Sequence, residues 1–204
     1  MSDYGELDKK TLVVCGLEQE TQGQLNEYEV LYTGVGKVNA TYKLTQKFGK
    51  FGSYIPYDLI INYGTAGSRE LPVGELVDCT RFIQRDMDCT GFGILKGQTP
   101  FEDTEIILDS NSEFNPIGKH YVCGTGDNFV DNIEDEIEYV DVFDMEAYAL
   151  AKVCSYYYVS FISFKYITDN ANEYSVGDWN DNLGKGVIQF KEKVLDLLPI
   201  EEEF

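Results

Sequence analysis

The sequence predicts a single α/β domain with a mixed, curved central β-sheet flanked by helices. First, short apolar runs that are typical of β-strands alternate with segments in which apolar residues recur at helical spacing. Second, 204 residues with 43% hydrophobic content suffice for one well-buried core and are too few for two ordinary domains. Third, no internal repeat or low-complexity linker divides the chain, so we expect one domain over residues 1–204.

The strand-like and helical segments alternate along most of the chain. The apolar runs that predict strands cover residues 11–15, 28–33, 58–63, 73–83, 104–108, 120–125, 138–143 and 158–167. A helix is expected from Lys37 to Phe48, because it follows the turn Gly34-Val35-Gly36. A second helix is expected from Met145 to Tyr157, where apolar residues recur on one face.

The C-terminal part is predicted to form one amphipathic closing helix. It starts at Asn180-Asp181 and ends at Pro199, and its apolar positions are spaced by three and four residues: Leu183, Val187, Phe190, Val194 and Leu198. Residues 84–104, which are rich in glycine and contain Pro100, are expected to form an extended loop or an irregular strand near the functional site.

The composition excludes several classes of partner. A net charge of −20 and a pI near 4.2 argue against a nucleic-acid binder, which needs basic patches. One histidine and five cysteines without a Cys-x-x-Cys pair predict neither a zinc site nor a disulfide framework, so no metal is expected. The N-terminus lacks the apolar core of a signal peptide, and no segment approaches the roughly 20 apolar residues of a membrane span. We therefore expect a cytoplasmic protein with no membrane partner.

Acidic side chains follow three of the predicted strands. Glu20 comes after residues 11–16, Asp144 and Glu146 come after 138–143, and Asp169 comes after 159–168. In an α/β protein with a mainly parallel sheet, ligands bind outside the carboxyl ends of the strands. The positions of these acids therefore predict a ligand site at that edge of the sheet.

Two segments rich in small residues point to the same edge. Residues 62–68 (NYGTAGS) follow one apolar run, and residues 124–129 (GTGDNF) follow another. Small residues let backbone amides approach a ligand closely, and Phe129 offers an aromatic face for stacking.

Converging acids of this kind suit the chemistry of a glycosidic bond. One acid protonates the leaving group, one activates water, and one holds the sugar hydroxyls. Taken singly, each has another explanation: Glu20 as a surface residue, Glu146 as a complement to a helix dipole, and Asp169 as a cap of the next turn. Their common position at strand ends favours a site.

Six segments carry a resemblance to a known family. They are CGLEQE (15–20), TGVGKVNA (33–40), NYGTAG (62–67), GDNF (126–129), DMEA (144–147) and ITD (167–169). In this order they resemble the nucleoside phosphorylase/nucleosidase superfamily, and the chain looks most like its 5′-methylthioadenosine/S-adenosylhomocysteine nucleosidases. The resemblance covers nearly the whole chain and implies a nucleoside phosphorylase-like fold.

The resemblance implies an activity and residues that perform it. The activity is hydrolysis of the N-glycosidic bond of a purine nucleoside, which releases adenine, with Glu20 activating the attacking water and Asp169 donating a proton toward N7 of the purine. The implied substrate contacts are Glu146 and Met145 at the ribose hydroxyls, Phe129 and Val130 at the base, and Thr65 near the ribose and the water. No cofactor is implied, and members of the family commonly form homodimers in which one subunit lends apolar residues to its neighbour's pocket.

The chain departs from the family pattern in two places. The segment between Glu20 and Gly34 is much shorter than in the family, which has a helix and a hairpin there. Lys165 stands where the nucleosidases have an arginine near the catalytic water, so the resemblance implies that it is a further substrate-binding residue. Lysine keeps the charge without the planar fork.

Two alternative functions follow from the same residues. A phosphorylase would use phosphate as the nucleophile and should present arginines to it, but the chain has only three, and Glu20 would repel phosphate. The segment GTAG (64–67) nevertheless resembles the phosphorylase version of that loop. A non-catalytic nucleoside-binding relative would be expected to lose one of the acids, whereas this chain retains Glu20, Glu146 and Asp169. Hydrolysis is the favoured interpretation.

Overall fold

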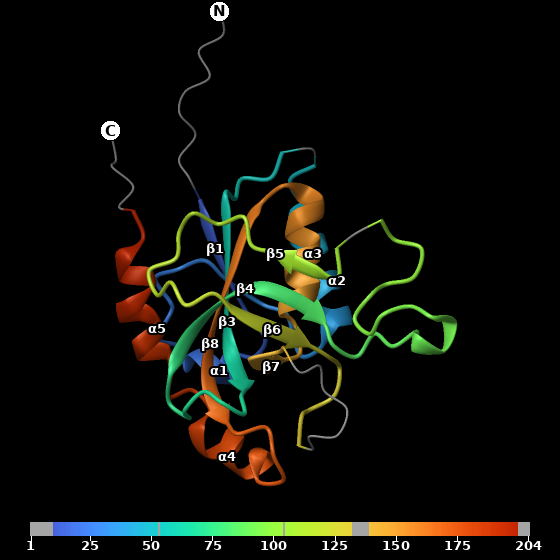
Figure 1. Ribbon diagram of the computed structural model, residues 1–204. Helices are drawn as coiled ribbons and strands as arrows, with labels where there is room; N and C mark the ends of the chain where they lie inside the picture. The colour runs from blue at the N-terminus through green and yellow to red at the C-terminus, as the bar shows by residue number, and fades with distance from the viewer. Residues whose placement is uncertain (1–9, 53, 104, 132–138, 200–204) are drawn as a thin grey trace, which may run out of the picture.

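Eight strands form one mixed β-sheet in the computed structural model, which describes residues 10–52, 54–103, 105–131 and 139–199 (Figure 1). The strands are β1 (Thr11–Cys15), β2 (Val30–Tyr32), β3 (Leu59–Gly67), β4 (Leu76–Gln84), β5 (Ile107–Asp109), β6 (Tyr121–Thr125), β7 (Val142–Asp144) and β8 (Ser160–Asp169). The helices are α1 (Glu18–Thr21), α2 (Lys37–Gly49), α3 (Ala147–Tyr157), α4 (Ser175–Asn182) and α5 (Val187–Lys193), with 3₁₀ turns at Thr90–Phe92 and Leu195–Leu197. The predicted single α/β domain with a mixed sheet is confirmed.

The curvature of the sheet is strong enough to close part of it. The strand order is β2-β1-β3-β7-β6-β4-β5, and β8 pairs with β3 on one side and with β4 on the other. Because β3 also pairs with β7, the strands β3, β8, β4, β6 and β7 form a closed ring. Strand β3 is parallel to both β1 and β8, between which it lies, so the carboxyl ends of the three strands lie at the same edge.

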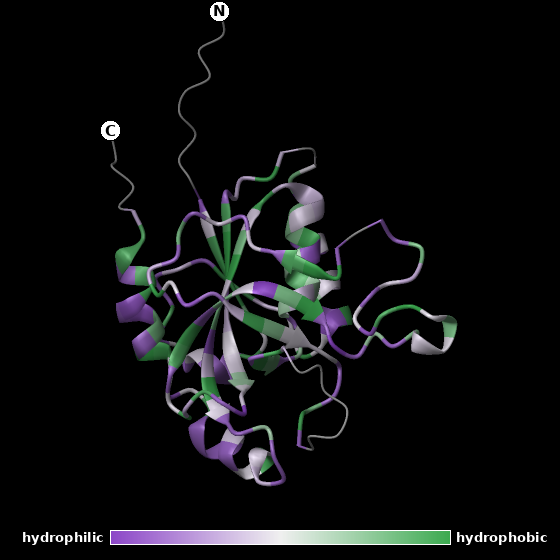
Figure 2. Cartoon of the chain, in the orientation of Figure 1, coloured by the Kyte–Doolittle hydropathy of each residue, from purple (hydrophilic) through white to green (hydrophobic). Residues whose placement is uncertain are grey.

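The alternation of side chains along each strand divides the core into layers. In β1, Leu12 and Val14 pack in the cluster that contains residues of α2 and α3. Val13 and Cys15 point the other way, into the cluster that contains residues of α5. Figure 1 shows α2 and α3 on one side of the strands and α5 on the other, and Figure 2 shows hydrophobic residues along the strands between them.

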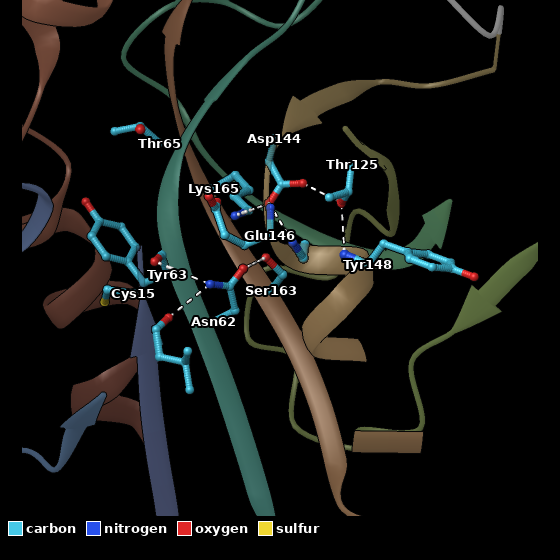
Figure 3. A network of polar contacts seen from close by, with 12 residues as sticks. Cys15, Asn62, Tyr63, Thr65, Thr125, Asp144, Glu146, Tyr148, Ser163 and Lys165 are labelled. Carbon is cyan, nitrogen blue, oxygen red and sulfur yellow. Dashed lines mark hydrogen bonds and ion pairs between the residues drawn. The ribbon is translucent and has the colours of Figure 1, made fainter. Parts of the chain in front are cut away.

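A buried amide fixes the register of the strands that lead to the carboxyl edge. Asn62 of β3 donates to the carbonyl of Val14 in β1 at 2.9 Å, and its own oxygen accepts from Ser163 of β8 at 2.8 Å (Figure 3). The same register places Thr65 beside Tyr166 and, after a bulge, Gly67 beside Asp169. Residues more than 100 positions apart are therefore neighbours at this edge.

The C-terminal prediction of one closing helix is wrong. The expected start at Asn180-Asp181 lies in the last turn of α4, and a separate α5 begins only at Val187. Between them Gly184 has a φ of +79°, which breaks the helix, and the chain passes so close to β8 that a Cβ on Gly186 would lie 2.2 Å from the Tyr166 ring.

Other boundaries differ by a few residues. Strands β3 and β8 run four and two residues further than predicted, to Gly67 and Asp169. The loop 84–104 lies near the functional site only at its start, and Figure 1 shows the rest (green) extending away from the sheet. Residues 104 and 138, which belong to two predicted strands, lie outside the described residues. Of the helices in the described ranges, none combines the length and the apolar character that crossing a bilayer requires.

Candidate active site

A pocket of about 240 Å³ opens at the carboxyl edge of the sheet. It is lined by Gly16, Leu17, Glu20, Val35, Thr65, Ala66, Gly67, Arg85, Asn128, Phe129, Val130, Phe143, Asp144, Met145, Glu146, Asp169 and Trp179. These residues come from the ends of β1, β3, β4, β7 and β8 and from the loops and helices that follow them. The three acids predicted from strand ends lie in the wall of this one pocket.

Glu20 is held in a fixed orientation although it belongs to a helix of only one turn. Its side chain is 5% exposed and folds back over the start of α1, where Oε2 accepts from the Leu17 N–H at 2.9 Å. Oε1 accepts from both the backbone N–H and the hydroxyl of Thr65, at 2.7 and 2.9 Å. The short segment after Glu20 therefore does not displace this carboxyl group from the pocket.

Glu146 lies where the chain enters α3. Its Oε1 accepts from the Gly36 N–H at 2.8 Å, so it bridges α3 to the turn before α2. Burial, together with the nearby negative charge of Asp144, raises the pKa of Glu146 to about 8. Burial therefore favours the neutral form of this carboxyl group in the unliganded site.

Lys165 and Asp144 form a buried ion pair next to the pocket (Figure 3). The Lys165 Nζ lies 2.8 Å from Asp144 Oδ2, which also accepts from the Ala147 N–H at 2.8 Å. Thr125 donates its hydroxyl to Asp144 Oδ1 at 2.5 Å. Burial alone would raise the pKa of Asp144, but the Lys165 ammonium and these hydrogen bonds lower it below its ordinary value. The predicted contact between Lys165 and substrate stays a prediction, because Lys165 is not among the described residues that line the pocket.

Asp169 ends β8 and is buried. Its Oδ2 accepts from the Thr168 hydroxyl at 2.9 Å, and its Oδ1 accepts from the Ala171 N–H at 3.1 Å. Opposite it, Gly67 leaves the necessary space, because a Cβ there would lie 2.6 Å from Asp169 Oδ1. The glycine in β3 is therefore required by the carboxyl group in β8.

The remaining predicted residues lie in the same pocket. Phe129, which is 39% exposed, and Val130 line it from the loop after β6, and Met145 lines it from the turn before α3. Thr65 lies on β3, lines the pocket and donates its hydroxyl to Glu20. Among the residues that the structure describes, no group of three His, Cys, Asp or Glu could hold a metal ion.

Arg85 and Trp179 line the pocket but were not among the predicted site residues. Arg85, at the end of β4, donates to Asn128 through Nη1 to Oδ1 at 3.0 Å and through Nη2 to the carbonyl at 2.5 Å. Trp179 of α4 donates its indole N–H to Thr65 Oγ1 at 3.0 Å. No strand-end pattern marks either residue, although a single tryptophan and one of only three arginines were available as compositional signals.

Comparison with known proteins gives the class of protein to which this fold and pocket belong. A family model described as the phosphorylase superfamily matches residues 17–198, and the chain belongs to this superfamily. Its curated relatives include nucleosidases. A 5′-methylthioadenosine/S-adenosylhomocysteine nucleosidase of Staphylococcus haemolyticus is 30% identical over 84% of this chain and 77% of the relative. One of Bacillus thuringiensis is 32% identical over 93% of this chain and 90% of the relative. The predicted family resemblance is confirmed.

Solved structures agree with the fold. A 5′-methylthioadenosine/S-adenosylhomocysteine nucleosidase of Helicobacter pylori matches with a TM-score of 0.82 at 22% identity, covering 95% of this chain and 100% of that chain. A futalosine hydrolase of the same organism matches with a TM-score of 0.81 at 21% identity, covering 94% and 99% of the two chains. The whole described domain therefore has the architecture of these hydrolases.

Proposed function

We propose that this protein hydrolyses the N-glycosidic bond of a purine nucleoside, with 5′-methylthioadenosine, S-adenosylhomocysteine or both as substrate and adenine as a product. The observation that carries the proposal is the convergence of Glu20, Glu146 and Asp169 on one pocket. The nucleosidases among its relatives, which match nearly the full chain, supply the substrate class.

The chemistry divides between two acids. Glu20, as a carboxylate, accepts a proton from water while the water oxygen bonds to C1′ of the ribose. The C1′–N9 bond breaks, its electron pair passes to the purine, and Asp169 protonates N7 of the leaving base. Glu146 holds the ribose hydroxyls while positive charge develops on the sugar, as in other oxocarbenium-like transition states.

The other lining residues orient the nucleoside. Phe129 stacks on the base, the backbone of Val130 contacts the base edge, and Met145 packs at the ribose. Thr65 lies near the ribose and the water. Lys165 acts through Asp144, to which its ammonium is bound, and offsets part of the negative charge gathered here.

We also propose that the active form is a homodimer and that it works in the cytoplasm. A second, more open depression is lined by Val35, Gly36, Val38, Asp127 and Met145, and it shares Val35 and Met145 with the main pocket. Val38 is 76% exposed at this place, which supports its burial against a second copy. The cytoplasmic location is supported by the free thiols of all five cysteines.

The decisive experiment separates water from phosphate as the nucleophile. In phosphate-free buffer the protein should release adenine and a free reducing sugar from 5′-methylthioadenosine, and added phosphate should not raise the rate. The physical reason is that a carboxylate at Glu20, bound to both donors of Thr65, repels a phosphate dianion. Formation of a ribose 1-phosphate at a rate that scales with phosphate would establish a phosphorylase instead. Nucleoside binding without release of base would establish a non-catalytic relative.

A further inference from the structure

The hydrogen bond from Trp179 to Thr65 determines the donor-to-acceptor direction of a series of hydrogen bonds that ends on Glu20. An indole N–H can donate but cannot accept, so Thr65 Oγ1 must act as the acceptor in this 3.0 Å contact. The hydroxyl hydrogen of Thr65 is then available for one donation, and Glu20 Oε1 lies 2.9 Å away. The series of hydrogen bonds therefore runs from the Trp179 N–H through the Thr65 hydroxyl to the carboxylate of Glu20.

This direction has a consequence for the carboxyl group. A hydroxyl that accepts one hydrogen bond becomes a stronger donor in the next, so the indole strengthens the hold of Thr65 on Glu20. The Thr65 N–H donates to the same oxygen at 2.7 Å, and the Leu17 N–H fixes the other oxygen at 2.9 Å. Glu20 is thereby oriented as an acceptor, which is the state that a base toward water requires.

The position of Trp179 is itself fixed, because α4 is attached beside the second catalytic acid. Asn182 at the end of α4 donates to the carbonyl of Thr168 at 2.9 Å, one residue before Asp169. At its start, the N–H of Ser175 donates to the carbonyl of Asn172. Figure 1 shows α4 next to the end of β8 at the carboxyl edge of the sheet. The indole is therefore held at a defined place in the pocket wall.

We propose that Trp179 is a positioning residue for the hydrolytic step, acting through Thr65 to hold Glu20 in the orientation that activates water. This inference rests on the proposed hydrolase function and adds a residue to it. The competing explanation is that Trp179 only shapes the pocket wall with its ring, in which case its N–H is dispensable.

Five variants separate the two explanations: Trp179→Phe, Thr65→Val, Thr65→Ser and the two double variants that combine Trp179→Phe with each Thr65 substitution. Phenylalanine keeps an aromatic ring and removes the N–H. We expect kcat to fall about tenfold in Trp179→Phe while KM changes by less than about twofold, the scale of one lost hydrogen bond. In the Thr65→Val background the same substitution should have no further effect on kcat, whereas with Thr65→Ser the effect should persist. An equal loss in both backgrounds, or a change confined to KM, would overturn the proposal.

A spectroscopic readout does not depend on activity, because Trp179 is the only tryptophan of the chain. The protein therefore gives a single indole N–H cross-peak in a ¹H–¹⁵N spectrum. We expect this peak to move upfield in Thr65→Val and to stay near its original position in Thr65→Ser. An unchanged peak in Thr65→Val would overturn the inference even if the enzyme is active. Failure of the wild-type protein to hydrolyse any nucleoside would instead contradict the proposed function, and the peak would still test the contact.

Discussion

At the scale of single residues, Glu20 and Asp169 share a means of support, because both carboxyl groups accept from a nearby backbone N–H and from a threonine hydroxyl. The isosteric amide keeps the shape of each side chain and one oxygen as an acceptor, but it cannot exchange the proton. We expect Glu20→Gln and Asp169→Asn each to lower kcat by at least about a hundredfold with little change in melting temperature, the usual effect of removing a positioned acid or base. Steady-state kinetics measures kcat, and thermal unfolding measures the melting temperature.

The matched control for this prediction lies in the same turn of helix. Glu18 is exposed at the start of α1, so Glu18→Gln should leave kcat within about twofold of the wild type, as expected for a surface substitution. Near-normal turnover in Glu20→Gln combined with a loss in Glu18→Gln would move the role of the base from Glu20 to Glu18.

The raised pKa of Glu146 predicts how stability depends on pH. Its pKa rises from 4.5 to about 8 on folding, because burial and Asp144 disfavour the charged form. The folded state therefore binds this proton more tightly than the unfolded state does. The stability that the proton gives the folded state is fully present below pH 4.5 and is lost as pH rises through about 8. Within that window the unfolding free energy should fall by up to about 1.4 kcal/mol per pH unit because of this group.

Glu146→Gln removes that titration while keeping the shape of the side chain. We expect the variant to gain stability relative to the wild type as pH is raised across the window, measured by urea unfolding of the unliganded proteins. Stability curves that stay parallel from pH 4.5 to about 8 would mean that Glu146 is already ionised in the folded protein.

At the scale of elements, β4 supports the loop that follows β6. The guanidinium of Arg85 binds both the side chain and the carbonyl of Asn128, and it lies against Gly126, where a Cβ would be 2.7 Å from Cζ. Phe129, which directly follows Asn128, is the residue proposed to stack on the purine. The end of one strand therefore sets the position of the base-binding loop.

We expect Arg85→Met to raise KM for the nucleoside about tenfold with a smaller change in kcat, because charged hydrogen bonds contribute about 1.5–3 kcal/mol and the loop loses them. Arg81→Met is the matched control, since Arg81 lies on the same strand, is exposed and does not line the pocket. A kcat loss without a KM change in Arg85→Met would argue that Arg85 acts on the chemistry instead of on the loop.

The elements also show what the sequence could predict. Strand β1 and helix α2 have clear patterns and start where they were expected, because apolar periodicity and a preceding glycine turn are local signals. The C-terminal helix was predicted wrongly, because its apolar spacing continues across a break imposed by the close contact of Gly186 with Tyr166. Such a contact between β8 and the following segment is tertiary, so periodicity along the chain does not record it.

At the scale of the whole molecule, the site depends on a topology that joins distant segments. Glu20 and Asp169 could be predicted to converge, since β1, β3 and β8 are parallel and end at the same edge. Glu146 could not be placed on that ground, because β7 runs antiparallel to β3 and reaches the same pocket through the closure of the sheet. The closed ring of strands, the pairing of Lys165 with Asp144 and the contact of Trp179 with Thr65 could not be predicted either, because each depends on a specific register between β3, β7 and β8 or on where α4 packs.

The proposed dimer gives the last prediction. Val38 lies in the first turn of α2, two residues after the Gly36 N–H that binds Glu146, and its side chain is 76% exposed beside the pocket. If a second copy covers this face, Val38→Asp places an unpaired charge in the interface and should convert the protein to a 23.1 kDa monomer. We expect kcat/KM to fall at least about tenfold as well, because the pocket then stays open to water, which weakens the electrostatic interactions inside it.

Analytical ultracentrifugation at moderate salt measures the change in mass, since chains with a net charge of −20 repel each other when unscreened. Ile188→Asp is the control, because Ile188 is also exposed but lies on α5, on the other side of the sheet from α2. It should leave both the mass and kcat/KM unchanged. A wild-type protein that is a fully active monomer would contradict the dimer while leaving the proposed hydrolysis intact, because the three acids lie within one chain.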